Sequence, residues 1–192
     1  MKDRIDKILD FLKEIEKYKT IERKIILSNG MKESDAEHSW HMAMFLILFQ
    51  KELPKEASME KMLKLALIHD LVEIYAGDTF SFDEEARKDK KEREDKASEK
   101  LFSQLPEDLG KELKELFNDY NKRESKEAKI VNSIDKIQPI LQNIVEGGKN
   151  WVTHNLTYEI IDEYKRKDML HDGFLLNIYN RLMGEAKDKK LL

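Results

Sequence analysis

The segment 59–74 constrains the fold most strongly, because apolar side chains would surround a helix formed there on almost every side. A helix of that kind is stable only when other elements cover it. The whole chain contains 7 glycines and 3 prolines, and 39% of its 192 residues are charged. Such a composition is typical of helical proteins with solvated outer faces. We therefore predict an all-α, single-domain helical bundle that buries this segment.

Amphipathic patterns predict the other helices. Ser34 and Glu37 have the spacing of a capping box at the start of one of them. Pro139 cannot donate a helical hydrogen bond to the carbonyl group of Asp135, which predicts a kink beside that residue. The domain should span residues 1–192, with a core at about 20–147 and C-terminal helices of 150–190 packed on it. We expect helices at about 2–18, 34–53, 106–120, 126–147 and 173–186, and an exposed helix or a mobile lid at 83–100.

The composition excludes several classes of protein. The absence of cysteine excludes disulfides, thiolate metal sites and cysteine nucleophiles. A net charge of −4 gives no support for nucleic-acid binding. No apolar run approaches the roughly 20 residues that a membrane span requires. We therefore expect a cytoplasmic protein with neither a nucleic-acid nor a membrane partner.

His69 and Asp70 interrupt the buried segment, and buried polar groups are costly unless they are paired or bind a metal. His38 lies upstream and Asp135 lies downstream, and both add a side chain of the ligand types that divalent ions prefer. The pattern predicts one metal site held by these four residues from three helices. The alternative is a buried histidine with carboxylates paired to lysines.

Glu73 follows His69 by four residues and would share its helix face. It could therefore act on water at the metal without being a ligand. His41, His154 and His171 are expected to be packing or surface groups. So few histidines favour a single ion.

These segments resemble the HD-domain superfamily of metal-dependent phosphohydrolases, and within it the 5′-deoxynucleotidase (YfbR-like) branch. The resemblance covers about 20–147. It implies an all-α fold, a nucleotide substrate, one divalent ion (Mn²⁺, Co²⁺, Fe²⁺, Zn²⁺ or Ni²⁺) on the four predicted ligands, and a homodimer. It also implies removal of phosphate from nucleoside 5′-monophosphates. The residues that carry it are Glu37-His38-Ser39-Trp40-His41, His69-Asp70-Leu71-Val72-Glu73, Ala76-Gly77-Asp78 and Asp135.

The resemblance also implies individual roles. Glu73 matches the carboxylate that deprotonates the attacking water, and Asp78 matches an acidic residue near the sugar and the leaving oxygen. Arg23 falls where the family has a phosphate-binding arginine, whose guanidinium offers a fork of donors. Lys24 would assist it, but it stands where the bacterial enzyme has an aromatic residue against the sugar. Lysine cannot stack in that way, so this chain departs from the family where deoxyribose is selected.

Two other functions remain open. An alarmone pyrophosphohydrolase shares the pattern His69-Asp70-x-x-Glu73, but carries a second acidic residue where this chain has Ile74. A cyclic-nucleotide phosphodiesterase is another alternative within the superfamily. A helical interaction protein with a structural metal is the third alternative. Such a site would rarely need the non-ligating Glu73 or Arg23.

Overall fold

Helices form almost the whole fold across residues 2–192, which the computed structural model describes. The prediction of an all-α fold is confirmed, with one small two-stranded sheet added. None of the described helices is long and apolar enough to cross a membrane. In chain order, the elements are α1 (Arg4–Glu14), η1 (Ile15–Thr20), β1 (Glu22–Ile26), β2 (Lys32–Ser34), α2 (Asp35–Leu48), α3 (Met59–Ile68), α4 (Glu73–Ala76), α5 (Lys90–Phe102), α6 (Glu107–Lys122), α7 (Lys126–Glu146), α8 (Lys149–Thr153), α9 (Tyr158–Lys165), η2 (Arg166–Met169) and α10 (Gly173–Asp188).

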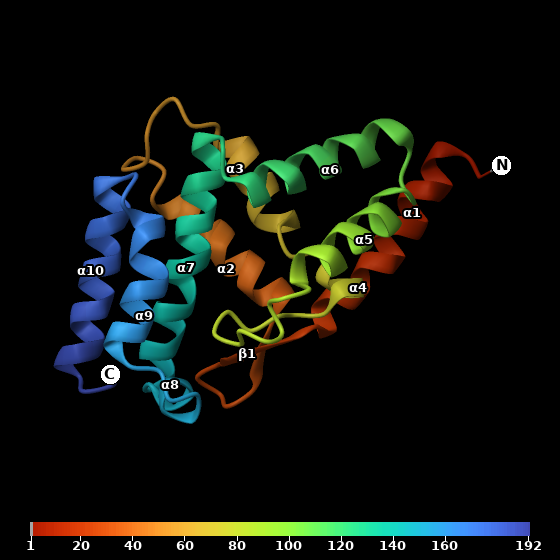
Figure 1. Cartoon of the computed structure of the whole chain (residues 1–192). Helices are drawn as coiled ribbons and strands as arrows, with labels where there is room; N and C mark the ends of the chain where they lie inside the picture. The colour runs from red at the N-terminus through yellow and green to blue at the C-terminus, as the bar shows by residue number, and fades with distance from the viewer. Residues whose placement is uncertain (1) are drawn as a thin grey trace.

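Helix α7 is the central element, and it packs against α2, α3 and α10 (Figure 1). Its inner residues Ile134 and Ile137 belong to an apolar cluster with Leu46 of α2, Leu65 of α3 and Tyr179 of α10. A second apolar cluster lies beneath α1, α5 and α6, on the right of the view. The end of α3 and the turn after it contribute to both clusters. The segment that carries the His-Asp doublet is therefore held at their junction.

Helix α3 ends at Ile68, earlier than the sequence predicted. The amide of Leu71 donates to the carbonyl of Ile68, and that of Glu73 donates to the carbonyl of Asp70, so the four-residue ladder is broken. His69 and Asp70 thus lie in a turn, and Glu73 opens the separate helix α4. The prediction of one helix over 59–74 was wrong. Complete burial of that segment was also wrong, because Leu67 is 53% exposed.

The β1–β2 hairpin was not predicted. Its strands pair antiparallel around a turn with Gly30, whose φ of 85° favours glycine. The side-chain amide of Gln142 in α7 donates to the carbonyl of Ile26 at 3.3 Å. This bond fastens the hairpin to the central helix and fixes β1, which carries Arg23 and Lys24, beside the site.

The capping box of Ser34 and Glu37 is confirmed at the start of α2. Residues 83–89 form turns, and α5 begins at Lys90 and buries Leu101 on its inner face. The expectation of an exposed helix for this stretch was thus only partly right. Helix α7 continues through Pro139, and the kink at that residue stays a prediction.

Candidate metal centre and adjoining cavity

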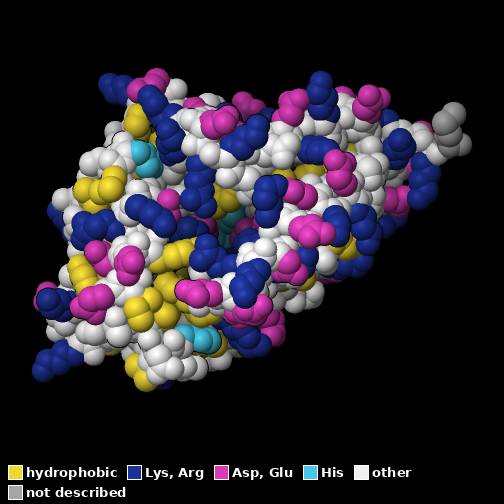
Figure 2. All heavy atoms as spheres, in the orientation of Figure 1, with side chains coloured by type: hydrophobic (Ala, Val, Ile, Leu, Met, Phe, Trp, Pro, Cys, Tyr) yellow, Lys and Arg dark blue, Asp and Glu magenta, His cyan; other side chains and the backbone are white. Residues whose placement is uncertain are grey.

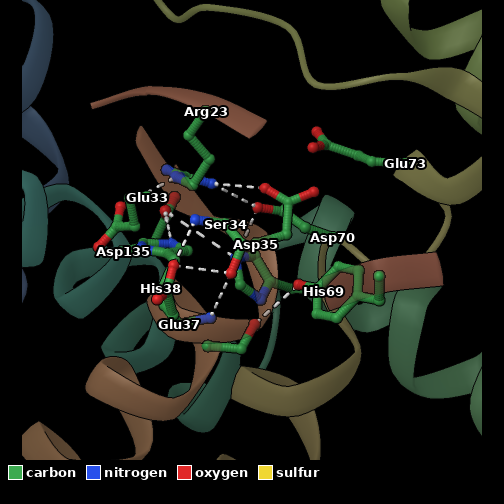
Figure 3. A network of polar contacts seen from close by, with 12 residues as sticks. Arg23, Glu33, Ser34, Asp35, Glu37, His38, His69, Asp70, Glu73 and Asp135 are labelled. Atoms are coloured by element: carbon green, nitrogen blue, oxygen red, sulfur yellow. Dashed lines mark hydrogen bonds and ion pairs between the residues drawn. The ribbon is translucent and has the colours of Figure 1, made fainter. Parts of the chain in front are cut away.

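The predicted metal ligands come together from α2, the turn after α3, and α7 (Figure 3). Nε2 of His38 lies 3.1 Å from Oδ1 of Asp135, and Nε2 of His69 lies 4.0 Å from the same oxygen. Oδ2 of Asp70 is 3.0 Å from Nε2 of His69. His38, His69 and Asp135 each offer a ligand atom within 4.8 Å of the others, and Asp70 adjoins them.

The hydrogen bonds of both imidazoles direct their Nε2 atoms to this point. Nε2 of the Gln138 amide donates to Glu33 at 2.6 Å, so its oxygen faces Nδ1 of His38 at 2.8 Å. Nδ1 of His69 donates to the carbonyl of Ala66 at 3.0 Å. Both protons therefore sit on Nδ1, and each Nε2 presents a lone pair. Nε2 of His69 is buried and has no hydrogen-bond partner. Lone pairs facing carboxylates repel them unless a cation lies between, so these residues fit a divalent ion.

The charge states suit the same conclusion. Burial and the nearby Arg23 lower the pKa of His38 to about 4, so its imidazole is neutral at neutral pH. Burial also acts to lower the pKa of His69, but the carboxylates of Asp70 and Asp135 outweigh it and raise that pKa. Burial acts to raise the pKa of Asp70, yet His69 and Arg23 bring it below its usual range. The two ionised carboxylates thus attract positive charge to Nε2 of His69, where a metal ion would take the place of a proton.

A cavity of about 500 Å³ opens beside this centre. Figure 2 shows a hollow in this face, with hydrophobic and histidine side chains inside it and charged side chains around it. Its volume is within the range of small-molecule sites. His38 lies behind the cavity wall and is fully buried. The other predicted site residues all line the cavity: Arg23, Lys24, His69, Asp70, Glu73, Asp78 and Asp135.

Arg23 extends from β1 into a cluster of carboxylates (Figure 3). Its guanidinium lies 3.3 Å from Glu33, 3.4 Å from Asp35 and 3.2 Å from Asp70. Asp35 was not predicted as a site residue, but its side chain is fully buried against the arginine. Three carboxylates therefore orient one cation at the mouth of the metal centre.

Glu73 faces the cluster from the start of α4 (Figure 3). Its side chain is 1% exposed, its Oε2 atom has no hydrogen-bond partner, and Nζ of Lys90 lies 3.6 Å from Oε1. Burial raises the pKa of Glu73 well above its usual value, and the charges of Asp70 and Asp35 add to this. Burial also raises the pKa of Asp78. Glu73 is thus a basic carboxylate that is free to accept a proton.

Glu73, Asp35 and Asp78 also form a second set whose carboxylate oxygens lie within 4.8 Å of one another. Such a set could hold a further hydrated cation, because carboxylates are ligands for hard divalent ions. The small number of histidines in the sequence favoured a single ion. Counting histidines could not find this set, because it contains none.

Five lysines on the cavity wall were not predicted: Lys90, Lys91, Lys122, Lys136 and Lys165. Nζ of Lys136 lies 2.7 Å from Oδ2 of Asp135, and Nζ of Lys165 donates to the carbonyl of Lys136 at 2.9 Å. Lys90 comes from the charged stretch that the sequence analysis interpreted as a solvated face. Lys136 could have been found because it follows a predicted ligand. Lys165 could not, because nothing in the sequence places this one residue of the predicted C-terminal helices beside the metal centre.

Residues 15–174 match the model of the HD domain family. The chain is 35% identical to the 5′-deoxynucleotidase HDDC2 of Bos taurus over 70% of this chain, and this alignment spans 65% of that protein. It is 34% identical to the HDDC2 protein of Dictyostelium discoideum, over 70% of this chain and 74% of the relative.

Comparison of the structures gives the same relationship. A crystal structure described as a predicted metal-dependent phosphohydrolase from Magnetospirillum magnetotacticum MS-1 superposes with a TM-score of 0.90 and 36% identity, over 98% of this chain and 95% of the other. The resemblance inferred from the His-Asp doublet and its companions is therefore confirmed. By its sequence, its fold and the convergence of its histidines and aspartates, the chain belongs to the HD-domain family.

Proposed function

We propose that this protein is a metal-dependent phosphohydrolase that removes phosphate from nucleoside 5′-monophosphates, deoxyribonucleotides included. One observation carries the proposal: an imidazole and carboxylate centre opens into a cavity with basic residues on its wall. The relatives named 5′-deoxynucleotidase support the substrate class. A cytoplasmic location and a homodimer belong to the same proposal, and light scattering of the purified protein tests the dimer.

His38, His69, Asp70 and Asp135 would hold the ion. A divalent cation bound there would supply Lewis acidity toward a phosphate oxygen and lower the pKa of water. Mixed imidazole and carboxylate donors accommodate Mn²⁺, Co²⁺, Fe²⁺, Zn²⁺ and Ni²⁺ alike.

Glu73 is assigned the role of general base. Its unpartnered Oε2 atom and raised pKa suit it to take a proton from the attacking water. The water oxygen then bonds to phosphorus while the bond from phosphorus to the 5′ oxygen breaks. Asp78 faces the same cavity, and its raised pKa lets it supply a proton to the departing 5′ oxygen.

Arg23 and Lys24 are assigned the role of binding the phosphate group. The guanidinium fork of Arg23 can bind two phosphate oxygens and stabilise the charge that spreads over them. Glu33, which is 1% exposed, holds that guanidinium from behind. Lys90 also lines the cavity and adds positive charge there.

Phosphate release from ribo- and deoxyribonucleoside 5′-monophosphates, with Mn²⁺, Co²⁺ or Mg²⁺ supplied, tests the proposal. Release by the wild type and its loss in Asp70→Ala is the expected result. Full metal-dependent activity in Asp70→Ala would show that the site is wrong. Release of pyrophosphate from an alarmone, with no monophosphate cleavage, would assign the protein to the other branch of the superfamily.

A further inference from the structure

The cavity extends along α7 beyond the metal centre. Asp135, Pro139 and Asn143 all line it, at four-residue spacing on one face of this helix. With a rise of 1.5 Å per residue, Asn143 lies roughly 12 Å along the helix from Asp135. This span accommodates the sugar and base of a nucleotide whose phosphate is at the metal centre.

The far section of the cavity has apolar walls. Pro139 forms one side, and Trp151, Leu156 and Ile161 contribute from α8, the following loop and α9. Helix α8 lies at the end of α7 farthest from α6 (Figure 1). Apolar walls suit the faces of a nucleobase, since ligand pockets are mostly apolar with a few placed polar groups.

Asn143 supplies such a polar group. Its side-chain Nδ2 donates to the carbonyl of Pro139 at 2.6 Å. A carbonyl oxygen can only accept, so the amide nitrogen must face it and Oδ1 is the remaining atom. Oδ1 is buried and has no partner, and the residue is 3% exposed. A buried acceptor left unpaired is costly, so this oxygen favours a ligand that brings an N–H group.

Asn150 supplies a second carboxamide. It is 4% exposed and lines the same cavity, and the hydrogen bonds of residues 2–192 include none to its side-chain amide. Gly147 and Gly148 turn the chain between α7 and α8 with φ values of 88° and 75°. A Cβ on Gly148 would lie 2.8 Å from Cβ of Leu191, so the turn requires glycine. This packed turn holds Asn150 and the neighbouring Trp151 at the cavity wall.

We propose that Asn143 and Asn150 form a base-reading subsite, in which Oδ1 of Asn143 accepts a hydrogen bond from an N–H group on the edge of the nucleobase. The inference rests on the proposed function, because it takes the substrate to be a nucleoside 5′-monophosphate. Asparagine side chains suit base edges, and here Asn143 offers an acceptor while the carboxamide of Asn150 offers both an acceptor and a donor. Through this subsite, the enzyme would recognise the base of its substrate in addition to the phosphate.

The kinetics of phosphate release test this with matched substrates. The first pair is dAMP and purine 2′-deoxyriboside 5′-monophosphate, which lacks the amino group. The second is dCMP and its 2-pyrimidinone analogue, which lacks the corresponding amino group. We expect kcat/KM to fall by about tenfold to a hundredfold in at least one pair, because the analogue leaves the acceptor unpaired. A substrate without a base, 2-deoxyribose 5-phosphate, should be poorer still.

In the variant Asn143→Leu, kcat/KM for the amino substrate should fall to the value for its analogue. The value for the analogue itself should change little. Asn132→Leu is the matched control, because Asn132 is on the same helix and is 2% exposed, with an unpartnered Oδ1, but is not on the cavity wall. It should keep the wild-type preference. If neither variant folds, the comparison of substrates with the wild type decides alone.

Equal kcat/KM for both members of both pairs and for the baseless phosphate would overturn the subsite. So would a loss in Asn143→Leu that is the same for every substrate. Failure to release phosphate from any nucleotide would instead refute the proposed function. In that case, isothermal titration of the same nucleotide pairs into the wild type and into Asn143→Leu tests the subsite separately. Equal affinities for both members of each pair, in both proteins, would overturn it.

Discussion

Nε2 of His69 lies 3.0 Å from Oδ2 of Asp70, although the two residues are neighbours in the chain. On a continuous helix they would point about 100° apart. His69 still has a helical backbone conformation, and its amide donates to the carbonyl of Leu65, so the two side chains leave the chain in different directions and meet at their tips. The doublet can therefore present two ligand atoms to one ion from neighbouring positions.

Removing one member of this pair should abolish tight metal binding. We expect Asp70→Ala to weaken Mn²⁺ binding by more than about a hundredfold, because a charged ligand is lost while His69 stays buried. Isothermal titration of protein treated with a chelator measures this. An unchanged affinity would contradict the ligand assignment. A second, weaker binding event that disappears in Asp35→Asn would assign a further cation to the acidic set.

Gln138 should control metal affinity without touching the ion. Its oxygen fixes the proton of His38 on Nδ1, so Gln138→Ala should lower metal affinity by about tenfold to a hundredfold. Gln142→Ala is the matched control, one turn further along α7 and bonded to the hairpin instead. The same titration compares them, and equal losses in both variants would contradict a positioning role.

Arg23→Met should destabilise the metal-free protein. Glu33, Asp35 and Asp70 would lose their shared cation, and breaking a buried ion pair costs about 3 kcal/mol or more. Added Mn²⁺ should restore part of this loss, because a cation then neutralises Asp70. Urea unfolding with and without Mn²⁺ gives both values. A loss of unfolding free energy that Mn²⁺ does not reduce would show that the arginine and the metal centre are not coupled.

Lys165 should make stability depend on pH. Burial, with the charge of Lys136, lowers its pKa to about 7 from the model-compound value of 10.5, despite the opposing charges of Asp135 and Asp168. Between these values the unfolded chain binds more protons, so stability rises with pH across that window. Lys165→Met lacks this dependence and should be the more stable protein below about pH 7.

Urea unfolding of both proteins from about pH 6 to 10 measures the difference, which should shrink as pH rises. Lys167→Met is the control, because Lys167 is exposed two residues further on. Parallel stability curves for wild type and Lys165→Met would show that this lysine is charged throughout.

The convergence of His38, His69 and Asp135 could be predicted because each is a chemically distinctive residue in an apolar helical setting. His69 and Asp70 are expensive in such a place, and that cost is visible in the sequence alone. The break after Ile68 could not be predicted, because the local pattern is equally good for a longer helix and packing between two apolar clusters decides it. The hairpin was missed for a similar reason, since its short strands are fixed by contacts with α7.

The cavity wall was predicted less well than the metal centre. Asn143 and Lys165 are ordinary residues in helical segments, and only the arrangement of α7, α8 and α9 brings them to one space. Asp78 and Arg23 were placed by resemblance, and both line the cavity. Their assigned roles stay predictions for the experiments above.

The turn at Gly147 and Gly148 divides the cavity wall into two parts along the chain. The four predicted metal ligands precede the turn, as does Asn143, whereas α8 and α9 follow it and line the far end of the cavity. Substitutions after the turn can therefore reshape the space around a bound molecule without replacing any predicted ligand. Selectivity for that molecule can then evolve faster than the metal centre within one small protein.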